Sequence, residues 1–363
     1  MKNLYILLVT LLTYTFSNAQ IVDIPDANFK DALVNHNVAK LIGSPDHVDV
    51  DTNNDGEIQV AEAENVYWLE VHSMDISSLE GIQSFINIEH INFQYNQVSE
   101  IDLSQNSILE KLYCGNNQLI SIDITQNQSL KDISIWQNQL TSLDVTQNLN
   151  LERISCYSNQ INSIDVTNNI NLITLILWIN QITSLNISQN PNLIFLSCSQ
   201  NQIANLDISQ NTILETLYCS ENQLVNLNLN NGNNNNMVTM FAHNNPNLNC
   251  IQVDDVFYAN NLICDFPYAS WCKDDWAEYS ELCELGTEDN THISVTIYPN
   301  PVQDVLRINT QQPIESLKIY NLQGQLIKED SNSSVDVSQL TAGLYFIQLI
   351  IDGKTVTKKF IKE

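Results

Sequence analysis

The chain has 363 residues, enough for two or three domains. Its 42 acidic residues outnumber 14 basic ones, for a net charge of −28, and residues 290–363 contain seven of each, so the excess lies upstream. An acidic surface repels phosphate backbones, which excludes nucleic acid as the expected partner but leaves cations, basic proteins and neutral glycans.

Residues 1–19 are typical of a secretory signal peptide. Lys2 precedes the apolar run Leu4–Leu12, and the small residues Ser17 and Ala19 suit cleavage before Gln20. This run is too short to remain as a membrane anchor, and no other stretch is long enough. We therefore expect an exported protein with no transmembrane segment in its mature chain.

Residues 20–80 are expected to form an N-terminal cap. A helix should begin near Pro25 and Asp26, with Phe29, Leu33 and Val34 on one face. Residues 51–62 then fit the calcium loop of an EF-hand, and Gly56 permits its sharp turn. The expected oxygen ligands are Asp51, Asn53, Asp55, the Glu57 carbonyl, Gln59 and Glu62.

This pattern favours a structural Ca²⁺ ion over the alternative, an acidic surface turn that merely matches the motif. Residues 45–48 make a poor entering helix. The loop is therefore expected to brace the cap rather than act as a paired switch.

The segment of residues 81–249 repeats every 21 residues. Each repeat carries an Asn-Gln pair followed by an aliphatic residue, with two further apolar positions three and five residues before the Asn. The Asn positions are Asn96, Asn117, Asn138, Asn159, Asn180, Asn201 and Asn222. This is the pattern of a leucine-rich-repeat solenoid, with one parallel β-strand per repeat and a core closed only by stacking. Residues 66–79 form an irregular first repeat in which Met74 replaces the Asn.

The second half of each repeat reads aliphatic-Asp-aliphatic, and a second Asn column follows it. We expect these Asp residues to cap turns on a solvated face; a ladder of bound cations is the alternative. Near residue 230 an Asn-rich insertion shifts the register by two residues, so the next repeat Asn is Asn245.

The eight cysteines fall into two groups. One inward column holds Cys114, Cys156, Cys198 and Cys219, which we expect to be free and buried, although adjacent rungs would allow a bond between the last two. The other four crowd residues 250–289, which should close the solenoid as a C-terminal cap. Two disulfides are expected there, and a zinc site is the alternative.

Residues 290–363 differ in composition from the repeats. Seven short alternating or apolar runs lie between turn signals, which predicts a small all-β sandwich.

Three stretches resemble known families. The repeats resemble surface leucine-rich-repeat proteins of Bacteroidota and, in style, internalins. The sequences IPDANFKDALV and VDTNNDGEIQVAEA are similar to the region that precedes such repeats. YPNPVQDVLRI, IYNLQGQLI and VDVSQLTAGLYFIQLIIDGKTVTKKFIK resemble the type A C-terminal sorting domain of the type IX secretion system.

This resemblance implies export in two steps. The signal peptide would direct the chain across the inner membrane, and an outer-membrane translocon would then recognise residues 290–363. A secreted or surface-attached protein is the expected product. In the C-terminal cap, which departs from the family pattern, we expect Cys250 to pair with Cys283 and Cys264 with Cys272.

Outward positions of the strands should line a concave face. Two residues before successive repeat Asn residues stand Trp136, Tyr157 and Trp178, which predicts an aromatic ladder on three consecutive rungs. Arg153, Tyr113 and Ile176 should lie beside it. Exposed aromatic rows suit protein interfaces or sugars, although aromatic residues also fill sheet faces by strand propensity alone.

We therefore expect a non-catalytic binding or adhesion protein that recognises an extracellular protein or glycan. The alternative is a secreted glycan-degrading enzyme using paired carboxylates. No pair stands out, because the acidic residues fall mostly in repeated columns.

Overall fold

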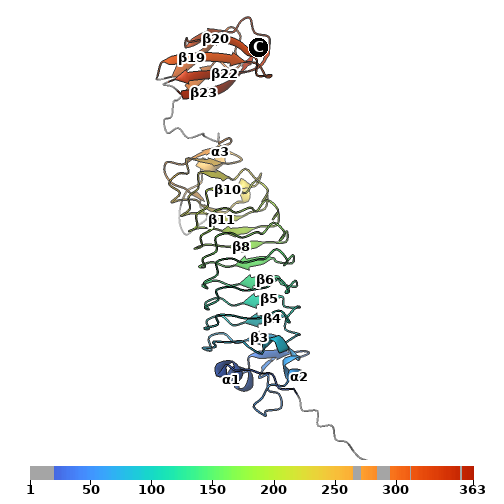
Figure 1. Ribbon diagram of the computed structural model, residues 1–363. Coiled ribbons are helices and arrows are strands. Elements are labelled where there is room, and N and C mark those ends of the chain that lie inside the picture. Colours follow the sequence, from blue (N-terminus) through green and yellow to red (C-terminus); the bar gives the residue numbers. More distant parts are fainter. Residues whose placement is uncertain (1–19, 265–270, 284–294, 311, 352–353) are drawn as a thin grey trace, which may run out of the picture. The chain divides into compact units, whose positions relative to one another are not determined.

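The computed structural model describes residues 20–264, 271–283, 295–310, 312–351 and 354–363 (Figure 1). The expected signal peptide, residues 1–19, lies outside this range. The chain divides into two compact units, residues 1–283 and 284–363. The boundary expected at residue 290 also lies outside the described residues.

The first unit begins with a small cap. Helix α1 (Ala27–Asn35) starts where expected, because the Asp26 carboxylate accepts hydrogen bonds from the amides of Asn28 and Phe29. Phe29, Ala32 and Leu33 bury one face of the helix. Strands β1 (Ala39–Leu41) and β2 (His47–Val48) pair antiparallel, and helix α2 (Val60–Ala63) begins within the last residues of the 51–62 loop.

The solenoid is built on a 12-stranded sheet in which each repeat contributes one short strand (Figure 1). Strand β1 pairs antiparallel with the first repeat strand, and all later neighbours pair parallel and in register. The repeat strands are β3 (Val66–Glu70), β4 (His90–Asn92), β5 (Lys111–Tyr113), β6 (Asp132–Ser134), β7 (Arg153–Ser155), β8 (Thr174–Ile176), β9 (Phe195–Ser197), β11 (Thr216–Tyr218), β13 (Thr239–Phe241) and β15 (Trp271–Cys272).

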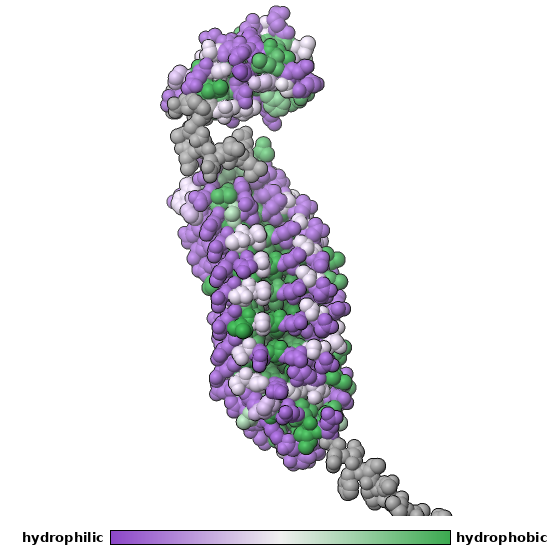
Figure 2. Space-filling view, viewed as in Figure 1, coloured by the Kyte–Doolittle hydropathy of each residue, from purple (hydrophilic) through white to green (hydrophobic). Residues whose placement is uncertain are grey.

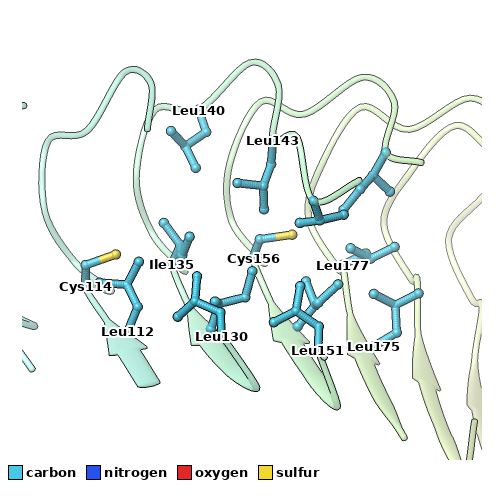
Figure 3. Close-up of a cluster of buried hydrophobic side chains, with 14 of the residues drawn as sticks. Leu112, Cys114, Leu130, Ile135, Leu140, Leu143, Leu151, Cys156, Leu175 and Leu177 are labelled. Carbon is cyan, nitrogen blue, oxygen red and sulfur yellow. The ribbon is translucent and has the colours of Figure 1, made fainter. Parts of the chain in front are cut away.

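Apolar side chains of successive repeats lie in rows inside the coil (Figure 3). Cys114, Ile135, Cys156 and Leu177 form one such row, and each is fully buried. The four cysteines of this column, Cys114, Cys156, Cys198 and Cys219, are free. Burial raises the pKa of the Cys156 thiol to about 12, which keeps it protonated and unreactive.

The repeat Asn residues turn inward and tie adjacent coils together. In Asn159 the side-chain amide donates to the carbonyls of Ile135 (2.9 Å) and Cys156 (3.0 Å), and its oxygen accepts from the Leu140 amide (3.0 Å). The first repeat lacks its own Asn, yet Asn96 from the next one bonds the amide of Met74. The repeat Asn residues therefore form a ladder of hydrogen bonds along the coil.

The second half of the repeats forms turns, as expected. The Asp144 carboxylate, for example, accepts from the amide and the hydroxyl of Thr146. In the last coils these segments become a second, parallel sheet of four strands, which the sequence did not predict. Its strands are β10 (Asn205–Asp207), β12 (Asn226–Asn228), β14 (Cys250–Gln252) and β16 (Glu278–Ser280).

Two disulfides close this end of the solenoid. Cys250 bonds to Cys283, and Cys264 bonds to Cys272, which is the expected pairing. Helix α3 (Val256–Asn260) lies between Cys250 and Cys264 in the chain. The shifted register after residue 230 still buries Met237, Met240 and Ala242 in the core.

The second unit has two antiparallel sheets around one core. Residues from both sheets, such as Leu306, Leu317 and Ile347, belong to the same buried cluster, so the expected sandwich is present. One sheet contains β17 (Val295–Tyr298), β18 (Val305–Thr310) and β21 (Ser334–Asp336). The other contains β19 (Ile314–Tyr320), β20 (Leu326–Asp330), β22 (Gly343–Ile351) and β23 (Lys354–Lys362).

Candidate functional site

The exposed side of the 12-stranded sheet is here called the strand face. In each three-residue strand the middle side chain points into the core, as for Ile133, Ile154 and Leu175, and its two neighbours point outward. The concave face expected from the sequence corresponds to this surface. Figure 2 shows a lengthwise band of hydrophobic residues on the solenoid, with hydrophilic residues on both sides.

Trp136, Tyr157 and Trp178 form an ordered stack just beyond strands β6, β7 and β8. The ring centroids of Trp136 and Tyr157 are 5.5 Å apart and the planes differ by 4°. Those of Tyr157 and Trp178 are 4.7 Å apart at 16°. All three residues are half-buried. The rings follow the rung spacing of about 4.8 Å, so each covers the faces of its neighbours and turns an edge outward.

Two further residues complete the N-terminal end of this aromatic stack. A Cβ atom on Gly115 would lie 2.3 Å from Cε2 of Trp136, so only glycine leaves room for the indole in this position. Tyr95 then meets the same indole edge-on, with centroids 5.3 Å apart and planes at 71°.

The other expected site residues lie on the same face. The Tyr113 hydroxyl donates to Asp132 Oδ2 (2.8 Å), and Arg153 Nε lies 3.8 Å from Asp132 Oδ1. Burial, and then the Asp132 carboxylate, raise the pKa of Tyr113, so its phenol stays protonated. Ile176 is half-buried on the rung of Trp178.

A second cluster, which we did not anticipate, lies at the N-terminal end of the strand face. The indole of Trp68 stacks on the His90 ring with centroids 3.6 Å apart, and Lys40 Nζ lies 4.8 Å from the Trp68 ring centre. Glu70 accepts from Trp68 Nε1 (2.9 Å) and Asn92 Nδ2 (2.7 Å) and lies 3.1 Å from His90 Nε2.

Trp68 and Glu70 also line an open depression of about 510 Å³. The sequence did not predict this cluster, because the irregular first repeat lacks the Asn from which the outward positions of the other repeats are counted. At the other end of the face, Phe195, Tyr218 and Phe241 contact each other across β9, β11 and β13. The sequence shows that these residues are aromatic, but it could not show that their rings contact each other.

The loop of residues 51–62 folds around the Asp51 carboxylate. This carboxylate accepts from the amides of Asp55 (3.1 Å) and Gly56 (2.8 Å), and Gly56 has φ +83°. Asn53 Nδ2 donates to Asp55 (3.1 Å) and to Gln59 (2.6 Å).

Glu62 accepts from Thr52 Oγ1 (2.8 Å) and from the amides of Asn53 (3.3 Å) and Gln59 (3.0 Å). Within the described residues, no group of three Asp, Glu, His or Cys side chains is gathered as a ready metal site. The donors of this loop are instead mixed carboxylate, amide and carbonyl oxygens, the hard ligands that suit Ca²⁺. A strand, β2, precedes the loop, so no entering helix is present.

Comparison with known proteins identifies the class. Residues 296–363 match the family of secretion system C-terminal sorting domains. The chain is therefore a secreted or cell-surface protein with a leucine-rich-repeat solenoid and a sorting domain of the type IX secretion kind. No curated protein matches it significantly. Within the described residues, no helix has the length and apolarity to cross a bilayer.

Solved structures support the repeat fold. The functional domain of InlJ from Listeria monocytogenes, which is described as including a cysteine ladder, is similar at 26% identity with a TM-score of 0.53. That match covers 64% of this chain and 52% of the InlJ chain, so this protein spans only about half of the InlJ length.

Two other similar structures have lower TM-scores. A leucine-rich-repeat protein of Leptospira interrogans has 21% identity and a TM-score of 0.42, covering 51% of this chain and 56% of that one. Internalin C2 of Listeria monocytogenes has 22% identity and a TM-score of 0.38, covering 52% and 91%.

Proposed function

We propose that this protein is a non-catalytic binding or adhesion protein that holds an extracellular protein or glycan on its strand face. The aromatic stack carries this proposal. Large rings held by their neighbours lose little conformational entropy on binding, and rows of exposed aromatic residues are typical of interface hot spots.

The carboxylates of the strand face support a binding role over hydrolysis. A glycan hydrolase needs two carboxyl groups facing one substrate bond. Glu70 is held by Trp68, Asn92 and His90, and Asp132 is shared between Tyr113 and Arg153. Each therefore fixes its neighbours on the face.

The double variant Trp136→Ala/Trp178→Ala tests the binding site. The mature protein is applied to a glycan array and to a panel of purified extracellular proteins, and every ligand retained by the parent is measured again. Loss of binding with a far-ultraviolet circular dichroism spectrum that still reports the parental fold is expected. Asp123→Asn/Asp165→Asn, on the opposite side of the coil, is the control. Unchanged affinity for every ligand in the Trp double variant would refute the assignment.

Export is proposed to depend on an outer-membrane translocon that recognises the C-terminal domain. Deletion of residues 290–363 should leave the solenoid inside the cell, whereas Asp123→Asn/Asp165→Asn, on the exposed turns of the solenoid, should not change export. Secretion of the shortened chain at the parental level would refute the proposal.

A structural Ca²⁺ ion is proposed for the loop, held by Asp51, Asn53, Asp55, the Glu57 carbonyl, Gln59 and Glu62. When bound, it would neutralise the clustered carboxylates and brace the cap. Calcium should raise the melting temperature of the parent and not of Asp51→Asn/Asp55→Asn. Calorimetry that detects no Ca²⁺ binding to the parent would refute the site.

A further inference from the structure

One rung of the strand face carries apolar side chains at all its outward positions after Thr174, the first residue of its strand. On the rung of residues 159–179 the outward side chains are Ile176, Trp178 and Ile179, here called the apolar crossbar. The rung before has Ser155, Tyr157 and Ser158 at these positions, and the rung after has Ser197, Ser199 and Gln200. The exposed Ile173 and Ile194 extend the apolar surface to the edge from which the strands start.

Ile179 is in a backbone conformation that isoleucine rarely adopts. Its φ is +53°, in the left-handed region, where a β-branched side chain is strained. The coil imposes this conformation on every regular rung, and the other occupants of the column are Tyr95, Asn116, Gln137, Ser158, Gln200, Glu221 and Asn244.

Ile179 also leaves 40% of its surface exposed, so core packing does not compensate for the strain. An exposed apolar residue in a strained backbone conformation does not stabilise this coil. Strain of this kind is characteristic of binding sites.

The aromatic stack ends at the same rung. Tyr157 covers one face of the Trp178 indole. The next residue in this column is Ser199, whose hydroxyl lies 3.1 Å from that of Ser220, and its side chain is too small to cover the other face. An uncovered indole face therefore lies next to Ile176 and Ile179. On its own rung this indole face is flanked by isoleucine, which favours an apolar side chain over the hydroxyl groups of a sugar ring.

The surroundings of the crossbar are acidic. Glu152 lies on the preceding rung, and Glu215 and Glu221 lie two rungs further along the sheet. All three are exposed, and among the described residues none of them forms an ion pair. The cations nearest in sequence are already engaged, Lys131 with Glu110 and Arg153 with Asp132. A partner that covers this surface gains from basic residues around an apolar centre.

We propose that the apolar crossbar of Ile176, Trp178 and Ile179 receives an aromatic or aliphatic side chain of a protein partner, flanked by lysine or arginine that meets the surrounding glutamates. This inference rests on the proposed function and specifies the class of partner: a protein rather than a glycan. The anchor side chain continues the aromatic stack on the free face of Trp178.

A displayed library of random 12-residue peptides and a glycan array, applied to the mature full-length chain, test the proposal. Selected peptides should combine an apolar anchor with nearby Lys or Arg, and raising the salt concentration should weaken their binding. They should bind Ile179→Asn at least tenfold more weakly. The melting temperature of that variant should not fall, because asparagine tolerates the left-handed region. Gln200→Asn, in the same column one rung away, should change affinity less than twofold.

Several outcomes would overturn the proposal. Peptides that lack the apolar and basic pattern, or that bind Ile179→Asn as well as the parent, contradict it. Glycan binding that is lost in Trp136→Ala/Trp178→Ala, with no peptide selected, refutes the protein partner and leaves the binding function standing. If neither probe binds the parent, or binding survives in that double variant, both proposals fail.

Discussion

The two sides of the solenoid differ in how much their residues vary from rung to rung. On the side formed by the second half of each repeat, the same bond recurs on every rung. Asp102, Asp123, Asp144 and Asp165 each accept the backbone amide two residues on, at 2.9–3.0 Å. On the strand face the matching rungs carry Gly115, Trp136, Tyr157 and Trp178. The side chains in this column make no recurring hydrogen bond to the backbone.

This difference separates the residues that build the coil from those that the coil presents. A residue that makes the same hydrogen bond at every turn stabilises the turn. A residue that changes from rung to rung is not required by the turn, so its identity is free to serve a ligand. Variants of each kind should therefore separate stability from binding, and the expected loss of stability decreases from the interior of the coil to its exposed turns.

The largest loss of stability is expected from Asn159→Ala, inside the coil. It removes the hydrogen bonds of this side chain to the carbonyls of Ile135, Cys156 and Tyr157 and to the amide of Leu140. Among the described residues the buried Leu140 amide then has no partner, whereas Asn138 and Asn180 still donate to the carbonyls of Ile135 (3.4 Å) and Cys156 (3.1 Å). An unpaired buried amide costs about 1–3 kcal/mol and each further lost hydrogen bond about 0.5–1.5 kcal/mol, so a loss of about 3 kcal/mol is expected in urea unfolding. The exposed Asn162→Ala is the control. A loss below 1 kcal/mol would show that the ladder does not hold the coils together.

Asn148→Ala, in the second Asn column, should cost less, about 2 kcal/mol. Its side-chain amide donates to the carbonyls of Ile124 and Asn127, both at 2.9 Å, but its oxygen is buried without a hydrogen-bond partner among the described residues. Alanine therefore removes an unsatisfied atom together with two bonds. Urea unfolding measured beside Asn159→Ala decides the order, and a larger loss for Asn148→Ala would reverse this interpretation.

The sequence predicted the features that depend on repetition. The register of the Asn, aliphatic and Asp columns follows from a period of 21 residues, and the sandwich follows from alternation between turn signals. The second sheet could not be predicted in this way. Asn205–Asp207 forms a strand, whereas Ser163, Ile164 and Asp165, with the same pattern, do not. Whether these segments pair as strands depends on the distance between successive coils on that side of the solenoid, which the residue pattern does not determine.

The candidate site could be predicted only in part, for a related reason. The column arithmetic placed Trp136, Tyr157 and Trp178 on one face. It could not show that the rings stack face to face, because that depends on side-chain rotamers and on the space above Gly115. The stacking leaves edges outward and one indole face free, which changes the ligand chemistry that the face favours.

Gly115→Ala should disturb the strand face with a moderate loss of stability. The new methyl group meets the Trp136 indole, which must rotate away from Tyr95 and Tyr157. We expect a change in the near-ultraviolet circular dichroism of the aromatic residues and a loss of about 1 kcal/mol, since the half-buried ring can move. Ser199→Ala, in the same column, should leave the spectrum unchanged. An unaltered spectrum in Gly115→Ala would contradict the close contact.

The smallest effect is expected from Asp144→Ala, on the repetitive side. The variant loses the bonds to the Thr146 amide and hydroxyl, but the site is exposed and repulsion from Asp123 and Asp165 is relieved, so about 0.5 kcal/mol is expected at pH 7. The Thr146 hydroxyl and then its amide lower the pKa of Asp144. The stabilisation by this carboxylate is therefore complete above the unfolded pKa near 3.8 and disappears as the pH falls through the lower, folded pKa.

The difference in stability between Asp144→Ala and the parent should shrink over that acidic range when melting is followed against pH. Asp144→Asn separates the bond from the charge. Asn186 already occupies this column and accepts the Ser188 amide at 3.1 Å, so an amide oxygen can replace the carboxylate. The Asn variant should match the parent at pH 7 because it keeps the acceptor and loses the repulsion. A loss as large as that of the Ala variant would mean that the negative charge, and not the hydrogen bond, stabilises these turns.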